Sequence, residues 1–158
     1  MRQDTQEAFL AIIIFDLEFT AWEGSLARGW SGPDEHREIV EIGAVRINLE
    51  APDQPDQHFS VLVRPAINPQ LSDYFTELTS ISQHILDAEG KSLDAALQLF
   101  CDFANGASHY YSYGNDGDVV SENCTLLGIE NPLDQSIMVN ARDEIKLAYG
   151  LNHSVTSS

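Results

Sequence analysis

The first apolar run of the chain, Ala8 to Phe15, contains three consecutive isoleucines and shows no alternation of polar and apolar residues. A short run of this kind is typical of a strand buried on both faces at the centre of a sheet. Two more strands are predicted at Ile39 to Leu49 and His58 to Arg64, because β-branched residues recur in both and a segment rich in Pro and Asp, 51–57, separates them. We therefore expect a three-stranded meander.

Helical periodicity replaces the strand pattern after Pro69. Ser72 and Ser82 can each cap a short helix, and the spacing of apolar residues predicts a longer helix over about 92–105. Short strands are then predicted over 109–113 and 137–139, and each is followed by a helix, over 119–127 and 140–150. This order of elements predicts one α/β domain with a mixed five-stranded sheet over residues 8–150, followed by a polar tail over 151–158.

Acidic residues follow two of the predicted strands directly. If the first strand continues past Phe15, Asp16 and Glu18 project from one face, because side chains two residues apart share a side of a strand. Two carboxylates this close need a compensating cation, and Mg²⁺ or Mn²⁺ prefers oxygen ligands. A third acid, Asp116, follows the segment 109–113, at the strand end where open α/β sheets bind ligands. Each acid also has a structural interpretation, as an exposed strand end for Glu18 and an Asn-Asp-Gly turn for Asp116.

The charge of the chain limits which partners it can bind. It has 25 acidic and 8 basic residues, a formal net charge of −17 at pH 7, which argues against a partner held mainly by phosphate neutralisation. Any phosphate that the chain did bind would have to be held mainly by metal ions and a local pocket. The first apolar run is far shorter than the roughly 20 residues that cross a membrane. With no secretory signal pattern at the N-terminus, a cytoplasmic protein that does not bind membranes is expected.

Five segments of the chain resemble the DEDD superfamily of 3′-5′ exonucleases, which has the ribonuclease H-like fold, and are most similar to its Eri-type exoribonucleases. The resemblance implies two-metal hydrolysis of phosphodiester bonds from the 3′ end of a single-stranded nucleic acid, with RNA favoured over DNA. The segments occur in the family's order and are IIFDLEFTAWEG at 13–24, EIVEIGAVRI at 38–47, VRPAINP at 63–69, LSDYFTELTSI at 71–81 and SYGND at 112–116.

The resemblance also implies which acids hold the metal ions. Asp16 matches the ligand that both ions share, and Glu18 matches a ligand of the ion on the side of the nucleophile. Asp116 matches the third acid of the family, with Asp118 as the second candidate for that position. Two Mg²⁺ or Mn²⁺ ions are the implied cofactors.

The resemblance to the exonuclease family also implies which residues contact the substrate. The backbone at Phe19 and Thr20 matches a region near the terminal nucleotide, and the rings of Phe19 and Trp22 are candidates for stacking on a base. Ordinary core packing is the alternative for both rings. Leu78 resembles a residue that wedges beside the terminal base, although Ser80 stands where the family usually has a glycine.

The family completes its site with a fourth Asp on a C-terminal helix, five residues after a His or Tyr that acts as general base. His153 is the only histidine after the last predicted helix, and five residues beyond it lies Ser158 instead of an acid. Two explanations stay open: a fragment of a longer exonuclease, or a naturally short relative with impaired catalysis. Either would lack one helix over the sheet, and the uncovered apolar face would favour a homo-oligomer.

Two other functions compete with the exonuclease hypothesis. A non-catalytic module that binds nucleic acid or protein on a nuclease scaffold would explain the absent acid and base. A phosphatase of the haloacid dehalogenase type is disfavoured, because its chemistry needs Asp-x-Asp followed by Gly and Thr, whereas Asp16 is followed here by Leu17 and Glu18. Titration with Mg²⁺ or Mn²⁺ separates a metal-dependent enzyme from a bare scaffold.

Overall fold

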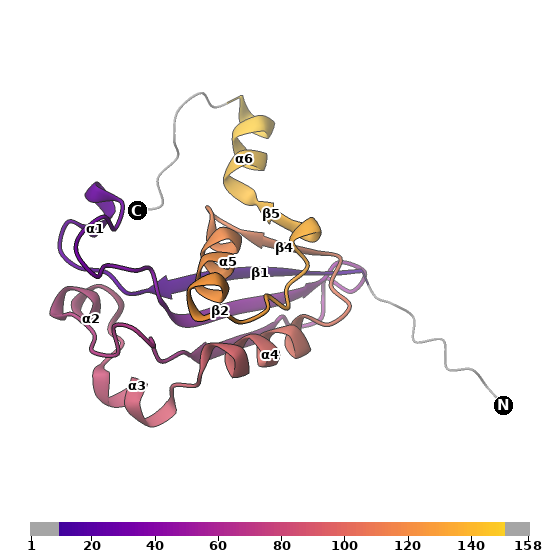
Figure 1. Cartoon of the computed structure of the whole chain (residues 1–158). Coiled ribbons are helices and arrows are strands. Elements are labelled where there is room, and N and C mark those ends of the chain that lie inside the picture. Colours follow the sequence, from indigo (N-terminus) through magenta and orange to yellow (C-terminus); the bar gives the residue numbers. More distant parts are fainter. Residues whose placement is uncertain (1–9, 151–158) are drawn as a thin grey trace.

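The computed structural model describes residues 10–150, which form a five-stranded sheet with helices packed against it (Figure 1). The strand order is β3-β2-β1-β4-β5. The first three strands pair antiparallel, whereas β4 lies parallel to β1 and β5 lies parallel to β4, as the predicted meander and mixed sheet require. The strands are β1 (Ala11–Phe19), β2 (Ile39–Asn48), β3 (Gln57–Leu62), β4 (His109–Ser112) and β5 (Met138–Asn140).

The predicted helices are all present. Among the described residues, a short α-helix over Ser25–Arg28 and a 3₁₀ turn over Gln135–Ile137 were not predicted. Ser72 and Ser82 cap their helices as expected, because each hydroxyl accepts a hydrogen bond from the backbone N–H three residues later. One prediction was wrong: α5 begins at Asp116 and not at Val119, so the candidate third acid lies in the first helical turn. The helices are α1 (Ser25–Arg28), which was missed, α2 (Asp73–Thr79), α3 (Gln83–Glu89), α4 (Leu93–Ala104), α5 (Asp116–Leu127) and α6 (Ala141–Tyr149).

One face of the sheet carries the main core, and α4 and α5 cover it (Figure 1). Alternate residues of β1, including Ile13 and Phe15, point into this core, where the Phe15 and Phe100 rings lie 5.6 Å apart. On the other face of β1, Ile14 is 46% exposed, so the predicted burial of this strand on both faces is wrong for the described residues. Asp16 lies on that second, accessible face because it is two residues after Ile14.

A second apolar cluster attaches α2 and α3 beside the end of β1. Phe75 of α2 and Leu86 of α3 are buried against Val40 of β2. The nearby Glu38 carboxylate is only 2% exposed and accepts hydrogen bonds from three consecutive backbone N–H groups, those of residues 66–68. These bonds satisfy a buried charge and fix the turn that leads to α2. No helix within residues 10–150 is long and apolar enough to span a bilayer.

Candidate active site

Three acids meet at one edge of the sheet. Asp16 and Glu18 lie near the carboxyl end of β1 on the same face, and Asp116 begins α5 a few residues after the carboxyl end of β4. Because β1 and β4 are parallel neighbours, their carboxyl ends lie at the same edge. The topology therefore brings together acids that are about a hundred residues apart in the sequence.

Asp116 is the most perturbed acid of this group. Its side chain is buried, at 8% exposure, and its Oδ2 atom makes no hydrogen bond within the described part of the chain. The pKa of Asp116 is raised from 3.8 to about 7. Loss of hydration is the largest cause, repulsion from Asp16 and Glu18 adds to it, and Arg142 and Arg37 oppose it. Asp16 and Glu18 on β1 therefore act electrostatically on Asp116, which follows the neighbouring parallel strand β4.

A fourth carboxylate, Glu41, also lies at this edge, and the sequence analysis missed it. Glu41 is opposite Glu18 in the β1–β2 pairing and accepts a hydrogen bond from the Ser60 hydroxyl at 2.7 Å. Loss of hydration raises the pKa of Asp16 and of Glu18. Repulsion from Asp16 raises the pKa of Glu18 further, and repulsion from Glu41 raises the pKa of both groups. The sequence did not reveal Glu41, because the register between the first two strands decides which residue of EIVEIGAVRI lies opposite Glu18.

These side chains suit a hard divalent cation in chemistry, although they do not yet enclose one. Within residues 10–150, no group of three or more His, Cys, Asp or Glu side chains is closed into a ready metal site. The donors are nevertheless carboxylates that repel one another, and Asp116 has a buried oxygen without a hydrogen bond. Such a group is stabilised by a cation that takes oxygen ligands. Asp118 lies in the same helical turn but is exposed, whereas Asp116 is buried at the sheet edge.

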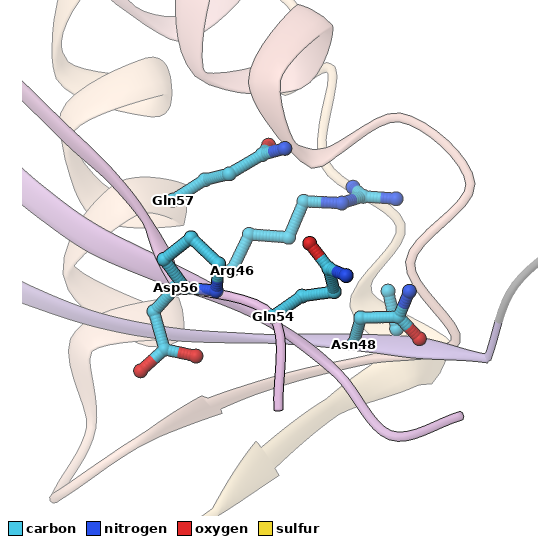
Figure 2. Close-up of a pocket in the computed structure, with 7 residues that line it drawn as sticks. Arg46, Asn48, Gln54, Asp56 and Gln57 are labelled. Carbon is cyan, nitrogen blue, oxygen red and sulfur yellow. The ribbon is translucent and has the colours of Figure 1, made fainter. Parts of the chain in front are cut away.

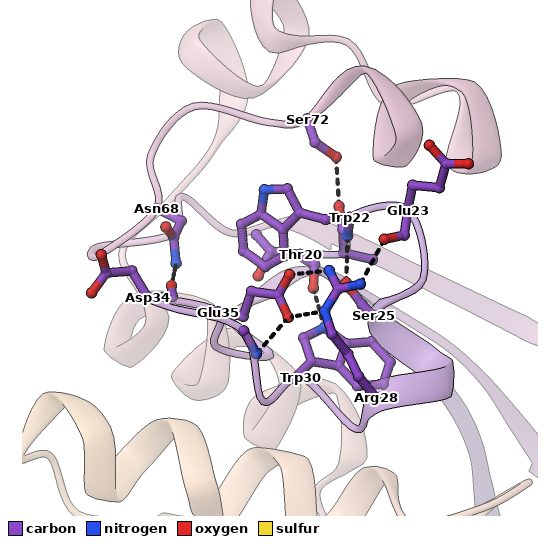
Figure 3. A network of polar contacts seen from close by, with 12 residues as sticks. Thr20, Trp22, Glu23, Ser25, Arg28, Trp30, Asp34, Glu35, Asn68 and Ser72 are labelled. Atoms are coloured by element: carbon purple, nitrogen blue, oxygen red, sulfur yellow. Dashed lines mark hydrogen bonds and ion pairs between the residues drawn. The ribbon is translucent and has the colours of Figure 1, made fainter.

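The loop after β1 is held by hydrogen bonds that involve Thr20 (Figure 3). The buried Thr20 hydroxyl donates to the backbone carbonyl of His36 at 2.6 Å and accepts from the backbone N–H of Glu38. Its carbonyl accepts from the indole N–H of Trp30 at 2.9 Å, and its N–H donates to the carbonyl of Glu38. The polar groups of Thr20 are thus used within the loop, and this residue shapes the edge of the site.

A cavity of about 190 Å³ lies directly beside Glu18. Its walls are mostly apolar, and the rings of Phe19 and Trp30 pack edge to face there, 5.4 Å apart. The structure brings the predicted substrate residues Phe19 and Leu78 to this cavity, whereas Trp22 is not among the described residues that line it. The lining consists of Leu17, Glu18, Phe19, Ala21, Ser25, Leu26, Trp30, Tyr74 and Leu78.

Two lining residues show what the sequence could and could not reveal. Tyr74 lies one helical turn before Leu78 on α2, so their spacing of four residues already placed both on one face. Trp30 could not be found in this way, because it lies in an irregular loop and has a left-handed backbone conformation with φ of 54°. The ion pair between Arg28 and Glu35 closes this loop (Figure 3).

A larger cavity of about 500 Å³ lies at the opposite end of β1, where Ala11 begins the strand (Figure 2). Its principal cation, Arg46, donates hydrogen bonds to the backbone carbonyls of Phe103 and Asn105. Asp56 is the only acid among the described residues that line it. Without a cluster of acids, this cavity is the weaker candidate for chemistry despite its size.

Comparison with known proteins agrees with this geometry. Residues 13–120 match the model of the RNase_T family, described as an exonuclease. The chain belongs to this exonuclease family. Human ERI1 exoribonuclease 2 is 35% identical over 101 residues, which is 63% of this chain and 13% of the relative. The 3′-5′ exonuclease Snipper of Drosophila melanogaster is 35% identical over 89 residues, 56% of this chain and 30% of the relative.

Solved structures of this exonuclease class share the fold. The nuclease domain of 3′hExo, a DEDDh family member bound to rAMP, has a TM-score of 0.75 at 24% identity and covers 92% of this chain and 73% of that one. The cell-death related nuclease CRN-4 has a TM-score of 0.68 at 15% identity and covers 96% of this chain and 52% of that one. The predicted family and fold class are therefore confirmed. His153, Ser158 and the polar tail over 151–158 lie outside the described residues.

Proposed function

We propose that this exonuclease-family chain forms part of a 3′-5′ exonuclease that removes nucleotides from the 3′ end of single-stranded nucleic acid. The observation that best supports the proposal is the position of Asp16, Glu18 and the buried Asp116 at the carboxyl ends of the parallel strands β1 and β4, with an apolar cavity beside Glu18. The chain aligns with only 13% and 30% of the two relatives above, so the activity of the whole protein is part of the proposal.

The acids have a defined task in this function. Enzymes of the DEDDh class generally use divalent metal ions. We infer Mg²⁺ or Mn²⁺ here, and Asp16, Glu18 and Asp116 are the residues of this chain that would hold the ions. When bound, such ions activate a water and stabilise the leaving 3′ oxygen. The carboxylates hold the ions, and the apolar lining beside Glu18 takes the terminal base, for which each stacked ring contributes about 1–3 kcal/mol.

RNA is the substrate we favour. The human relative is named an exoribonuclease, and one structure with the same fold is described as 3′-end specific recognition of histone mRNA stem-loop by 3′-exonuclease. These descriptions apply to those proteins. They support RNA as the first substrate to test here, with DNA of the same sequence as the comparison.

A second function deserves a test because of one observation. The acids within residues 10–150 do not form a closed three-ligand metal site, which favours a nuclease scaffold that binds nucleic acid or protein without turnover. Calorimetric titration with Mg²⁺ and Mn²⁺ distinguishes the two functions. Binding that is lost in Asp16→Asn supports the enzyme, whereas no binding to the unchanged chain supports the scaffold.

The direct experiment is a nuclease assay on a 5′-labelled single-stranded oligoribonucleotide. We expect a ladder of products shortened from the 3′ end with Mg²⁺ or Mn²⁺, and none with EDTA. Asp16→Ala should abolish the ladder, whereas Asp53→Ala, which removes an exposed acid in the turn before β3, should leave it unchanged. Equal degradation by the Asp16→Ala protein would assign the activity to a contaminant and count against the proposal.

A further inference from the structure

Arg142 lies at the same sheet edge as the three acids, although no part of the sequence analysis pointed to it. It is the second residue of α6, directly after β5. Since β5 is parallel to β4, its carboxyl end adjoins the strand end that leads to Asp116. The ends of β1, β4 and β5 thus supply Asp16, Asp116 and Arg142 in that order along the edge.

The position of Arg142 is fixed by a small network around Asn140. The Asn140 side-chain oxygen accepts hydrogen bonds from the backbone N–H groups of Arg142 at 3.0 Å and Gly114 at 3.1 Å. Its amide nitrogen donates to the side-chain oxygen of Asn115 at 3.2 Å. These bonds fasten the first turn of α6 to the loop immediately before Asp116.

The guanidinium group of Arg142 also packs against that loop. Its central carbon lies 5.0 Å from the centre of the Tyr113 ring, a cation–π distance. An added Cβ at Gly114 would lie 3.7 Å from a terminal guanidinium nitrogen, so the group extends across this glycine. The ring contact and the hydrogen bonds of Asn140 together hold the guanidinium of Arg142 against the loop that leads to Asp116.

The hydrogen bonding of Arg142 differs from that of the other described arginines. Four of them donate from their guanidinium groups to a carboxylate or to backbone carbonyls: Arg28, Arg37, Arg46 and Arg64. In contrast, Nε of Arg142 is buried and makes no hydrogen bond within residues 10–150. A guanidinium stays charged at every relevant pH, so a buried N–H without an acceptor is unfavourable unless a ligand supplies one.

A ligand anion would complete this arrangement. Within residues 10–150, neither Nε of Arg142 nor Oδ2 of Asp116 has a hydrogen-bond partner, and the two residues follow the carboxyl ends of the neighbouring strands β5 and β4. A buried donor and a buried acceptor that make no hydrogen bond among the described residues thus lie at the same edge of the sheet. A cation that takes Asp116 and an anion that takes Arg142 would satisfy both, and a phosphate bound next to a metal ion is such an anion.

We infer that Arg142 binds a backbone phosphate of the nucleic-acid strand, on the side of the acids opposite to the apolar cavity. This inference rests on the proposed function, and it specifies the direction in which the bound nucleic-acid strand runs across the site. The cavity lies at β1, α1 and α2, and Arg142 lies two strand spacings from β1, about 10 Å away along the edge. A strand with its terminal base in the cavity therefore crosses the acids and reaches the planar, two-pronged guanidinium of Arg142.

The test is binding as a function of salt. A fluorescent single-stranded oligoribonucleotide with a 3′-terminal phosphorothioate linkage, which slows hydrolysis, is titrated with protein in Mg²⁺ at several KCl concentrations. Arg142→Gln should weaken binding roughly tenfold and reduce the slope of log K against log [KCl] by about 0.7, the value for one phosphate contact with a single strand. Arg142→Lys should keep the slope and lose part of the affinity. Lys146→Gln, which removes the same charge one turn later on α6, should change neither.

Each outcome has a distinct meaning. An unchanged slope in Arg142→Gln, with the unchanged chain still binding RNA, overturns the assignment of Arg142 and leaves the proposed exonuclease in place. Weaker Mg²⁺ binding with an unchanged slope would mean that Arg142 only supports Asp116, which also overturns it. Failure of the unchanged chain to bind at any salt concentration counts against both proposals.

A second measurement keeps the inference testable if Arg142→Gln does not fold. Oligoribonucleotides that carry one uncharged methylphosphonate linkage, moved stepwise from the 3′ end, remove single phosphate charges from the ligand. With the unchanged protein, one position should lower the salt slope by about 0.7, and with Arg142→Lys the affinity lost at that position should be smaller than in the unchanged protein. Equal losses at that position in both proteins would contradict the contact.

Discussion

Replacing Asp116 by Asn should stabilise the metal-free protein at neutral and alkaline pH. The pKa of Asp116 is raised to about 7 from 3.8 in the folded chain, so the folded state binds this proton more tightly than the unfolded state. The contribution to stability is therefore complete below about pH 4 and is lost as the pH rises towards 7. Because one pKa unit corresponds to 1.36 kcal/mol, the ionised carboxylate destabilises the fold by up to about 4 kcal/mol. Asp116→Asn removes that charge and keeps the shape of the side chain.

Urea unfolding in EDTA at pH 4 and pH 8, followed by tryptophan fluorescence, measures this effect. We expect Asp116→Asn to gain up to about 4 kcal/mol over the unchanged chain at pH 8 and little at pH 4. The matched control is Asp118→Asn, which removes an exposed charge from the same helical turn and changes the interaction with the helix dipole similarly. Mg²⁺ should stabilise the unchanged chain at pH 8 and have much less effect on Asp116→Asn. A gain for Asp116→Asn that equals that of Asp118→Asn, or is the same at both pH values, would refute the reasoning.

Three further changes test separate parts of the structure. Ser80→Gly should raise the free energy of unfolding by about 1 kcal/mol, because Ser80 has φ of 63° at the end of α2; a loss in urea unfolding would contradict this strain. Glu41→Gln should stabilise the metal-free protein at pH 8 by roughly 0.2–1 kcal/mol, since a like-charged pair across β1 and β2 is removed, and an unchanged midpoint in EDTA would count against the repulsion. Leu78 is 65% exposed, so Leu78→Ala should alter stability by less than about 0.5 kcal/mol while weakening RNA binding several-fold; Leu126→Ala on α5 is the control, and equal affinities of the two variants would remove Leu78 from the site.

Local chemistry made the elements of the fold predictable. The cap at Ser72, the turn between β2 and β3 and the apolar spacing of α4 are each specified by neighbouring residues, so their bounds came out within a few positions. The start of α5 was placed too late because Asn115, Asp116 and Gly117 have the composition of a turn. In the structure, Asp116 occupies the first helical turn, where an acidic residue interacts favourably with the helix dipole.

The site was only partly predictable because it depends on pairing across the sheet. Asp16 and Glu18 share a strand, so their common face follows from a period of two. Glu41 requires the register between β1 and β2, and Arg142 requires β5 to lie beside β4, which no local pattern specifies. The apolar run of β1 was equally ambiguous, since it predicts a buried strand without showing which face other elements cover.

The charge of the chain and the arrangement of its candidate site together predict how it binds a nucleic-acid strand. A chain with a net charge of −17 repels phosphates overall, so attraction must come from local groups such as bound metal ions and nearby arginines. The described cations that act on Asp116 are Arg142 and Arg37, and Arg37 is already paired with Glu122. If Arg142 and the metal ions together reach two or three phosphates, the slope of log K against log [KCl] should not exceed about 2 in magnitude, at roughly 0.7 for each phosphate. The affinity would then depend mainly on the terminal base and on the phosphates next to the metal ions, and the protein would bind strand ends in preference to strand interiors.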